Sequence, residues 1–280
     1  MTKPQKAYKN LDFLNSPSAR PLRVLAEFLE PAARFRKHNI HDTIVFFGSA
    51  RVVSPDEARK HHRQLSSKYP ARKRNAEQKK LIKQARTAVR MSRYYEEAQE
   101  LAKLLTDWSL SLGRGKRRFI VCSGGGPGIM EAANRGATEN KKGFTVGLNI
   151  SLPFEQYANP YITDDLSFEF HYFFIRKYWF LYLAKALVAF PGGFGTLDEF
   201  FEMLTLIQTE KTKKKLPIVV YGSDYWKKLV NFRALVDNGM IDEKDLDSFH
   251  FCDDPQEAFE YLKETLTREY LDTPKKRRRK

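Results

Sequence analysis

Short apolar runs alternate with longer amphipathic segments over most of the chain. The runs consist mainly of Val, Ile, Leu, Phe and Ala, and they cover 43–47, 119–122, 145–150, 167–170, 186–190, 217–221 and 249–251. Continuous apolar runs are typical of strands that are buried on both faces of a parallel sheet. The intervening segments have helical spacing, and helices are expected over 129–140, 173–184, 196–210, 225–237 and 255–270. The pattern therefore predicts an α/β fold with helices on both faces of a parallel sheet.

The same pattern divides the chain into a lead-in, a large domain and a tail. Residues 1–42 contain an amphipathic stretch and are interpreted as a helical lead-in. The alternation of strands and helices assigns 43–271 to the main domain. Residues 56–107 have no strand pattern, which predicts one or two long helices and a helical insertion at about 56–95. The polar residues 272–280 are typical of a disordered tail.

The net charge of +15 is concentrated in two segments. Residues 59–93 contain thirteen Lys or Arg and one acid, Glu77, which gives them a net charge of +12. The basic residues of 275–280 add +6, so the rest of the chain carries −3. Charge runs are usually solvated, and neither segment has a recognised nucleic-acid-binding motif. We therefore expect non-specific nucleic-acid contact through 59–93 and 275–280, and a dedicated nucleic-acid-binding protein stays as an alternative.

No part of the sequence predicts a membrane or secreted protein. The longest apolar stretch, 179–190, is interrupted by Lys185 and is shorter than the roughly 20 residues of a membrane span. The first residues lack the apolar centre of a signal peptide. Cys122 and Cys252 are too few for a disulfide scaffold and have no metal-ligand spacing. We expect two reduced core cysteines in a cytoplasmic protein.

Three glycine-rich segments follow predicted strands, namely GSAR at 48–51, SGGGPG at 123–128 and PGGFGT at 191–196. In an open parallel sheet, ligands bind beyond the carboxyl ends of the strands. Glycine lets backbone N–H groups approach a phosphate, and a following helix adds unpaired N–H donors. A tight turn would explain any single loop, whereas three loops at one edge favour a phosphate site. The loops match neither the G-x-G-x-x-G dinucleotide motif nor the G-K-[ST] of a P-loop.

Glu199, at the end of PGGFGTLDE, fits two interpretations. The spacing from Thr196 to Glu199 is a capping-box pattern, in which the glutamate closes the N-terminus of a helix. A carboxylate on a first helical turn beside an anion site is also suited to act as a catalytic base. The spacing alone leaves both interpretations open.

Arg176 and Lys177 interrupt the aromatic segment 168–180. Their stems can lie along aromatic rings while the charged groups reach water. Arg176 precedes the strand that ends at PGGFG, and this connection favours a position over the glycine loops. The aromatic segment itself fits either a core or a subunit interface, and His171 is interpreted as structural.

On these motifs, the sequence resembles the Lonely Guy family, the cytokinin riboside 5′-monophosphate phosphoribohydrolases, a branch of which is called lysine decarboxylase-like. The family motif P-G-G-x-G-T-x-x-E corresponds to 191–199, and Arg176-Lys177 matches its Arg-Lys helix motif. The first two glycine loops match as well, and the resemblance covers roughly 43–265. The LPFEQ and NPY sequences resemble the larger, often hexameric branch, whereas the basic block 59–93 departs from the family pattern as an insertion.

The resemblance implies a Rossmann-like sheet without a dinucleotide, and a catalytic pair of Arg176 and Glu199. It also implies substrate contacts in the glycine loops and at three further positions. These contacts are Gly48, Ser49, Gly124, Gly125, Gly126, Gly128, Glu155, Lys177, Gly192, Gly193, Gly195, Thr196 and Thr205.

We therefore expect a cytoplasmic hydrolase that cleaves the N-glycosidic bond of a nucleoside 5′-monophosphate. AMP or N6-modified AMP is the expected substrate, corresponding to an AMP nucleosidase or a cytokinin-activating enzyme, and the sequence leaves guanine and pyrimidine bases open. It implies a homo-oligomer, either a dimer or a hexamer, and we expect no cofactor and no metal. A non-catalytic nucleotide or cofactor carrier on the same fold is the second alternative.

Overall fold

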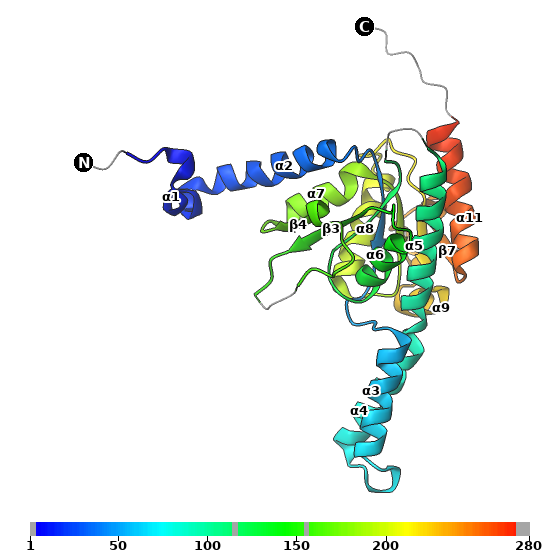
Figure 1. Ribbon diagram of the computed structural model, residues 1–280. Coiled ribbons are helices and arrows are strands. Elements are labelled where there is room, and N and C mark those ends of the chain that lie inside the picture. Colours follow the sequence, from blue (N-terminus) through cyan, green and yellow to red (C-terminus); the bar gives the residue numbers. More distant parts are fainter. Residues whose placement is uncertain (1–3, 114–116, 154–156, 273–280) are drawn as a thin grey trace.

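Seven parallel strands form the centre of the computed structural model, which describes residues 4–113, 117–153 and 157–272 (Figure 1). The order across the sheet is β4-β3-β2-β1-β5-β6-β7. The strands are β1 (Thr43–Phe47), β2 (Ile120–Ser123), β3 (Thr145–Ile150), β4 (Ser167–Phe170), β5 (Ala184–Ala189), β6 (Ile218–Tyr221) and β7 (His250–Cys252). The predicted α/β class with a parallel sheet is confirmed, and the fold is Rossmann-like.

Helices cover both faces of the sheet because successive side chains of a strand point to opposite sides. In β1, Val45 and Phe47 belong to the core on one face, whereas Ile44 and Phe46 belong to the core on the other. The first face is covered by α2 (Arg20–Lys37), α7 (Phe173–Leu183), α8 (Phe194–Gln208), α9 (Ser223–Leu229) and α10 (Phe232–Asp237). The second face is covered by α5 (Arg93–Ser111), α6 (Ile129–Thr138) and α11 (Pro255–Leu266).

Two segments extend away from this body in Figure 1. α1 (Leu11–Asn15) and the first turns of α2 extend on one side. α3 (Pro55–Lys68) and α4 (Ala76–Met91) form a helical hairpin that follows the carboxyl end of β1. A capping box fixes the start of α4, since the side chain of Asn75 accepts from the Gln78 N–H, and Gln78 accepts from the Asn75 N–H. The basic charge of 59–93 therefore belongs largely to a folded hairpin.

Two expected helices are divided in the structure. The segment 56–107 contains three helices, α3, α4 and α5, because α3 ends at Lys68, just before Pro70. The segment 225–237 contains α9 and α10, since Asn231 begins a new helix by accepting a hydrogen bond from a backbone N–H at 3.1 Å. The remaining short elements are Ala7–Lys9, Pro17–Ala19, Ala71–Lys73, Asp164–Leu166, Glu243–Ser248 and the π-helical turn Thr267–Leu271. No described helix is long and apolar enough to cross a membrane.

The strand order changes direction between β1 and β5. From β1 the chain adds β2, β3 and β4 on one side, and β5, β6 and β7 continue on the other. The GSAR loop follows β1 and the PGGFGT loop follows β5, so both leave the sheet at this point. The N–H of Ser49 donates to the carbonyl of Pro191 at 3.0 Å and joins the two loops. Ligands of open α/β sheets bind at such a point, so these two loops are the expected location of a binding site.

Candidate active site

Arg176 on α7 and Glu199 on α8 lie against each other at the carboxyl end of the sheet. Nη1 of Arg176 is 3.4 Å from Oε1 of Glu199, and the two side chains are only 12% and 13% exposed. Nε of Arg176 donates to the carbonyl of Leu148, at 2.7 Å, near the end of β3. The guanidinium also covers Gly124, where an added Cβ would lie 2.6 Å from Nη2. The second glycine loop thus leaves room for this arginine.

Burial shifts the pKa of each group toward its neutral form. Loss of solvation raises the pKa of Glu199 to about 7, while the charge of Arg176 works in the opposite direction. Loss of solvation lowers the pKa of Arg176, and Glu199 opposes that shift. A guanidinium nevertheless keeps its proton in proteins. The pair therefore combines a permanent cation with a carboxyl group that titrates near neutral pH.

α8 begins two residues earlier than the sequence pattern predicts. Its N-cap is Gly193, so Thr196 is the third residue of the helix and Glu199 lies in the second turn. The N-terminus has no side-chain cap, and Leu197 already donates its N–H to the carbonyl of Gly193, at 3.0 Å. The capping-box interpretation of Glu199 is therefore wrong. Its carboxylate pairs with Arg176 instead, and no side chain among the described residues caps the first N–H groups of α8.

Most glycines of the three loops are required by packing. An added Cβ would lie less than 3 Å from a neighbouring atom at Gly48, Gly124, Gly125, Gly128 and Gly192. Gly125 and Gly128 also have φ values of 75° and 74°, which favour glycine. At Gly128 the obstacle is the backbone of Ser49, whose carbonyl accepts a hydrogen bond from Ile129 at 3.1 Å. Tight packing alone therefore accounts for glycine at these positions.

Gly193 and Gly195 are different. An added Cβ at either position would have no atom of the described residues within 4 Å, and neither residue has a positive φ. Phe194, between them, is 92% exposed. Within the described part of the chain, neither packing nor backbone conformation requires glycine here, and the absence of side chains leaves the first N–H groups of α8 accessible. This open helix start is the part of the loops best suited to an anion.

Buried asparagines hold the second glycine loop, and sequence reasoning missed them. Nδ2 of Asn159 donates to the carbonyls of Gly125 and Gly126, each at 3.1 Å. It also donates to Oδ1 of Asn134 at 3.0 Å, and Ser123 donates to the same oxygen at 2.7 Å. The signal in the sequence was the NPY that begins at Asn159. Its partners lie far away in the chain, so local patterns did not reveal the network.

The structure describes two of the three other predicted contact residues, Lys177 and Thr205. Nζ of Lys177 is 2.8 Å from Asp198 and 3.1 Å from Glu202, which makes it a paired charge beside the site. Although burial opposes the charge, these hydrogen bonds raise the pKa of Lys177. Thr205 lies further along α8 and donates to a carbonyl of its own helix at 2.8 Å. Glu155 lies outside the described residues. Substrate binding by these three residues stays a prediction.

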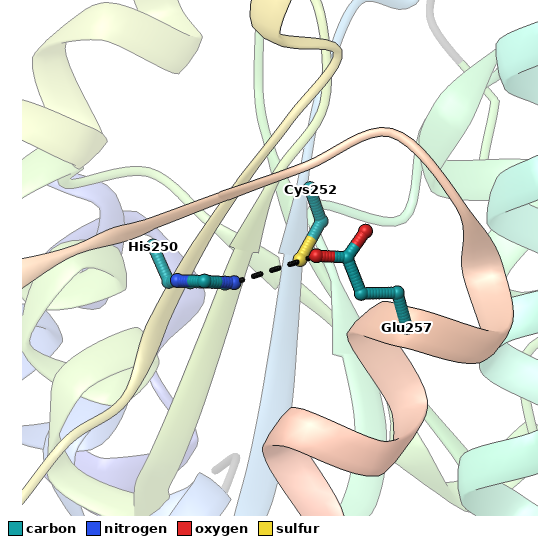
Figure 2. Close-up of side chains that lie close together, drawn as sticks. All are labelled: His250, Cys252 and Glu257. Atoms are coloured by element: carbon teal, nitrogen blue, oxygen red, sulfur yellow. Dashed lines mark ion pairs between the residues drawn. The ribbon is translucent and has the colours of Figure 1, made fainter.

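Figure 2 shows the group with metal-ligand potential that the described residues contain. Donor atoms of His250, Cys252 and Glu257 lie within 4.8 Å of one another, and the His250–Glu257 ion pair spans 3.7 Å. Burial raises the pKa of Cys252 to about 12, which disfavours the thiolate that binds metals. The sequence spacing did not indicate this group. It lies on β7 and α11, separated from Arg176 by several strands of the sheet.

The fold and this geometry define a Rossmann-like α/β protein with a buried arginine–carboxylate pair beside glycine loops. A segment of the chain is similar to the Lonely Guy-type family. The family model described as "Possible lysine decarboxylase" matches residues 130–262, which include Arg176 and Glu199. The basic hairpin lies outside the matched residues.

Curated relatives that match are the pyrimidine/purine nucleotide 5′-monophosphate nucleosidases of Escherichia coli, from strains K12 and O157:H7. Each is 28% identical over 135 residues, covering 42% of this chain and 28% of the relative. The match thus spans less than a third of these relatives' length. A solved structure, the molybdenum cofactor binding protein from the phototrophic bacterium Rippkaea orientalis, is 18% identical with a TM-score of 0.41. It covers 61% of this chain and 89% of that chain.

Proposed function

We propose that this chain is a hydrolase that cleaves the N-glycosidic bond of a nucleoside 5′-monophosphate. The observation that carries the proposal is the buried Arg176–Glu199 pair, 3.4 Å apart, beside the glycine loops. A purely structural ion pair gives no reason for the open glycines at 193 and 195. The match to the family model, and the nucleosidase activity named for the Escherichia coli relatives, support the same reaction.

In this proposal the 5′-phosphate binds at the start of α8. The N–H groups of Phe194, Gly195 and Thr196 belong to the first turn, where a helix offers donors without an intrahelical partner. The helix dipole adds a partial positive charge at the same place. Glu199 follows one turn later, so a ribose joined to the phosphate lies between the helix start and the carboxylate.

Breaking the C1′–N bond passes through a state with positive charge on the ribose, as glycoside hydrolysis does. Ionised Glu199 stabilises this charge, contacts the ribose hydroxyls and accepts a proton from the attacking water. The water oxygen bonds to C1′, and the base leaves with the bonding electron pair and takes a proton from solvent. The products are the free base and ribose 5-phosphate.

Arg176 acts as a fixed cation in this mechanism. Its guanidinium cannot serve as an acid at neutral pH. Held by Leu148 and Glu199, it can orient the carboxylate and stabilise negative charge on the phosphate or on the leaving base. The step needs no electron transfer, and the residues assigned to it supply the charges and the proton acceptor.

The preferred substrate in this proposal is AMP or an N6-modified AMP, which follows from the family resemblance. A test incubates the full chain with adenosine, guanosine, cytidine, uridine and N6-alkylated adenosine 5′-monophosphates, and measures free base by chromatography. Turnover by the wild-type protein should fall by about two orders of magnitude or more in Glu199→Gln and in Arg176→Ala.

Calorimetry and a melting curve are the controls for this test. Glu199→Gln should still bind nucleotide, because the helix start rather than the carboxylate holds the phosphate. A wild-type protein that binds monophosphates but cleaves none would support the carrier instead of the hydrolase. A fully active Glu199→Gln protein would contradict the mechanism proposed for Glu199.

We also propose that the protein forms a homo-oligomer, a dimer or a hexamer. Exposed aromatic side chains gather on α7, and three exposed leucines follow one side of α2: Phe173, Phe174, Tyr178, Tyr182, Leu22, Leu25 and Leu29. Phe28 on α2 packs edge-on against Tyr178 of α7, so the two helices contribute to one surface. Contiguous exposed apolar patches commonly mark protein–protein interfaces, and the partner proposed here is a second copy of the chain.

A further inference from the structure

The basic hairpin contributes one wall of a pocket at the glycine loops. A cavity of about 750 Å³ lies between α4 and the two loops that leave the sheet at β1 and β5. Lys80, Lys83 and Thr87 line it from α4, and Ser49, Arg51 and Gly193 line it from the loops. The insertion that departs from the family pattern therefore reaches the edge of the candidate active site.

The residues of α4 that line the pocket lie on one side of the helix. They are residues 80, 83, 84, 87, 88 and 91, which follow the three- and four-residue spacing of a helical stripe. Ile82 and Ala85 are buried, and they lie outside this stripe. α4 packs mainly against its hairpin partner α3, and its buried residues lie on a different side of the helix from the stripe that lines the pocket.

The charge around the pocket is positive and uncompensated. Arg51, Lys80 and Lys83 line it, and no Asp or Glu is among the lining residues that the structure describes. Within the described part of the chain, none of these three side chains forms an ion pair, although many other Lys and Arg do. Three cations held around one cavity without a carboxylate favour an anionic ligand.

The pocket continues from the proposed phosphate site. Gly192 and Gly193, which line it, directly precede the start of α8. A phosphate at that helix start is therefore next to the pocket that Lys80, Lys83 and Arg51 line, and Glu199 is not among the lining residues that the structure describes. In a ligand with more than one phosphate, the phosphates beyond the first can then contact the cationic side chains of the pocket.

We propose that this pocket binds the outer phosphates of a nucleoside 5′-diphosphate or 5′-triphosphate whose innermost phosphate lies at the start of α8. The inference rests on the proposed function and extends its substrate class beyond monophosphates. The reaction is otherwise the same, since the C1′–N bond breaks, water adds to C1′ and the base leaves with a proton. No phosphoanhydride bond is cleaved, so the second product is a ribose 5-diphosphate or 5-triphosphate.

The test compares two double variants of α4 with the same change in charge. Lys80→Glu/Lys83→Glu alters the pocket, whereas Lys79→Glu/Arg86→Glu alters exposed residues of the same helix that do not line it. For each protein, kcat/KM is measured with AMP and with ADP by the release of adenine. The wild-type protein should cleave ADP, and the pocket variant should lose at least about tenfold more activity with ADP than with AMP, because charge-assisted contacts to phosphate are among the strong hydrogen bonds. The control variant should change both substrates alike.

The outcomes separate this inference from the proposed function. A wild-type protein that cleaves AMP but neither cleaves nor binds ADP would overturn the inference and leave the function intact. Equal losses of ADP cleavage in the pocket and control variants would overturn it as well. If no nucleotide is cleaved, the proposed hydrolase function is wrong, and the pocket proposal is then tested by nucleotide binding alone. Calorimetry should then show that the wild-type protein binds ADP more tightly than AMP, and that only the pocket variant loses this preference. Equal affinities of the wild-type protein for ADP and AMP would overturn the inference.

Discussion

Nη1 of Arg176 and Oε1 of Glu199 lie 3.4 Å apart on two different helices, with both side chains largely buried. In water such a cation would lower the pKa of a neighbouring carboxyl group. Here the pKa of Glu199 is raised to about 7, because the loss of solvation outweighs the attraction of Arg176. An ionised Glu199 is thus poorly stabilised in the free protein and is suited to stabilise a positive charge that develops beside it.

The activity should depend on the ionisation of Glu199. Because the carboxylate is the active form in the proposed mechanism, kcat/KM for AMP should rise with pH through about 7 and then level off. The measurement is a rate profile between pH 5 and 9 at constant ionic strength. The residual rate of Glu199→Gln should lack this rise. A wild-type rate that is already maximal at pH 5 would contradict the assignment.

Two glycines of the site should respond differently to alanine. Gly195→Ala adds a Cβ in open space on a helix, so its stability should change by less than about 1 kcal/mol, while KM should rise at least about tenfold if a phosphate approaches there. Gly125→Ala meets Oδ1 of Asn149 at 2.3 Å and has a φ of 75°, so it should lose about 1–3 kcal/mol of stability. Urea unfolding and steady-state kinetics measure the two effects. An unchanged KM in Gly195→Ala would contradict the phosphate site.

The sequence was most informative where one local pattern decides the structure. The strands Thr43–Phe47 and Thr145–Ile150 have the predicted bounds, because a short run of mainly apolar and β-branched residues defines a buried strand. The start of α8 was missed because the capping-box spacing of Thr196 and Glu199 is a stronger local signal than the glycines before it. The position of α4 across a pocket from the glycine loops depends on the direction in which a long hairpin leaves the sheet, and no local pattern carries that information.

The exposed apolar surface on α2 and α7 should mediate self-association. Leu25→Glu and Phe174→Glu place a charge on two side chains that are 50% and 56% exposed, and either change should weaken association at least about tenfold. Met240→Glu, at a residue that is 68% exposed outside this surface, is the matched control. Light scattering after size-exclusion chromatography over a range of concentrations gives the oligomeric state. Variants that associate like the wild type would place the interface elsewhere.

Chelation should not change the rate of hydrolysis. The described group with metal-ligand potential, His250, Cys252 and Glu257, lies on β7 and α11, away from the Arg176–Glu199 pair. EDTA should therefore leave kcat and KM for AMP unchanged. His250→Ala is the control, since an effect of EDTA that disappears in this variant would come from the group in Figure 2. Loss of wild-type activity that is restored by Mg²⁺ or Zn²⁺ would contradict the proposed mechanism.

The raised pKa of Glu199 also predicts that this residue lowers stability at neutral and alkaline pH. The folded-state pKa of about 7 lies above the ordinary value of 4.5, so between these values the folded protein binds more protons than the unfolded chain. The free energy of unfolding therefore falls as pH rises through this window. The contribution of this pKa difference to the free energy of unfolding is fully present below pH 4.5 and is lost above about pH 7. A shift of this size corresponds to on the order of 3 kcal/mol.

The Glu199→Gln variant has no ionisable group at this position, so its free energy of unfolding does not fall in this way as pH rises. The change also removes the partner of Arg176, but that cation keeps its proton across the whole range, and its contact with Leu148 is not affected. The free energy of unfolding of the variant minus that of the wild type should therefore become more positive between pH 5 and pH 8, by up to about 3 kcal/mol. Urea unfolding at the two pH values gives this difference. Glu264→Gln, at an exposed residue of α11 far along the chain from α8, controls for the change in net charge. A Glu199→Gln difference that stays constant from pH 5 to pH 8 would mean that the carboxyl group of Glu199 is not held in a poorly solvated site.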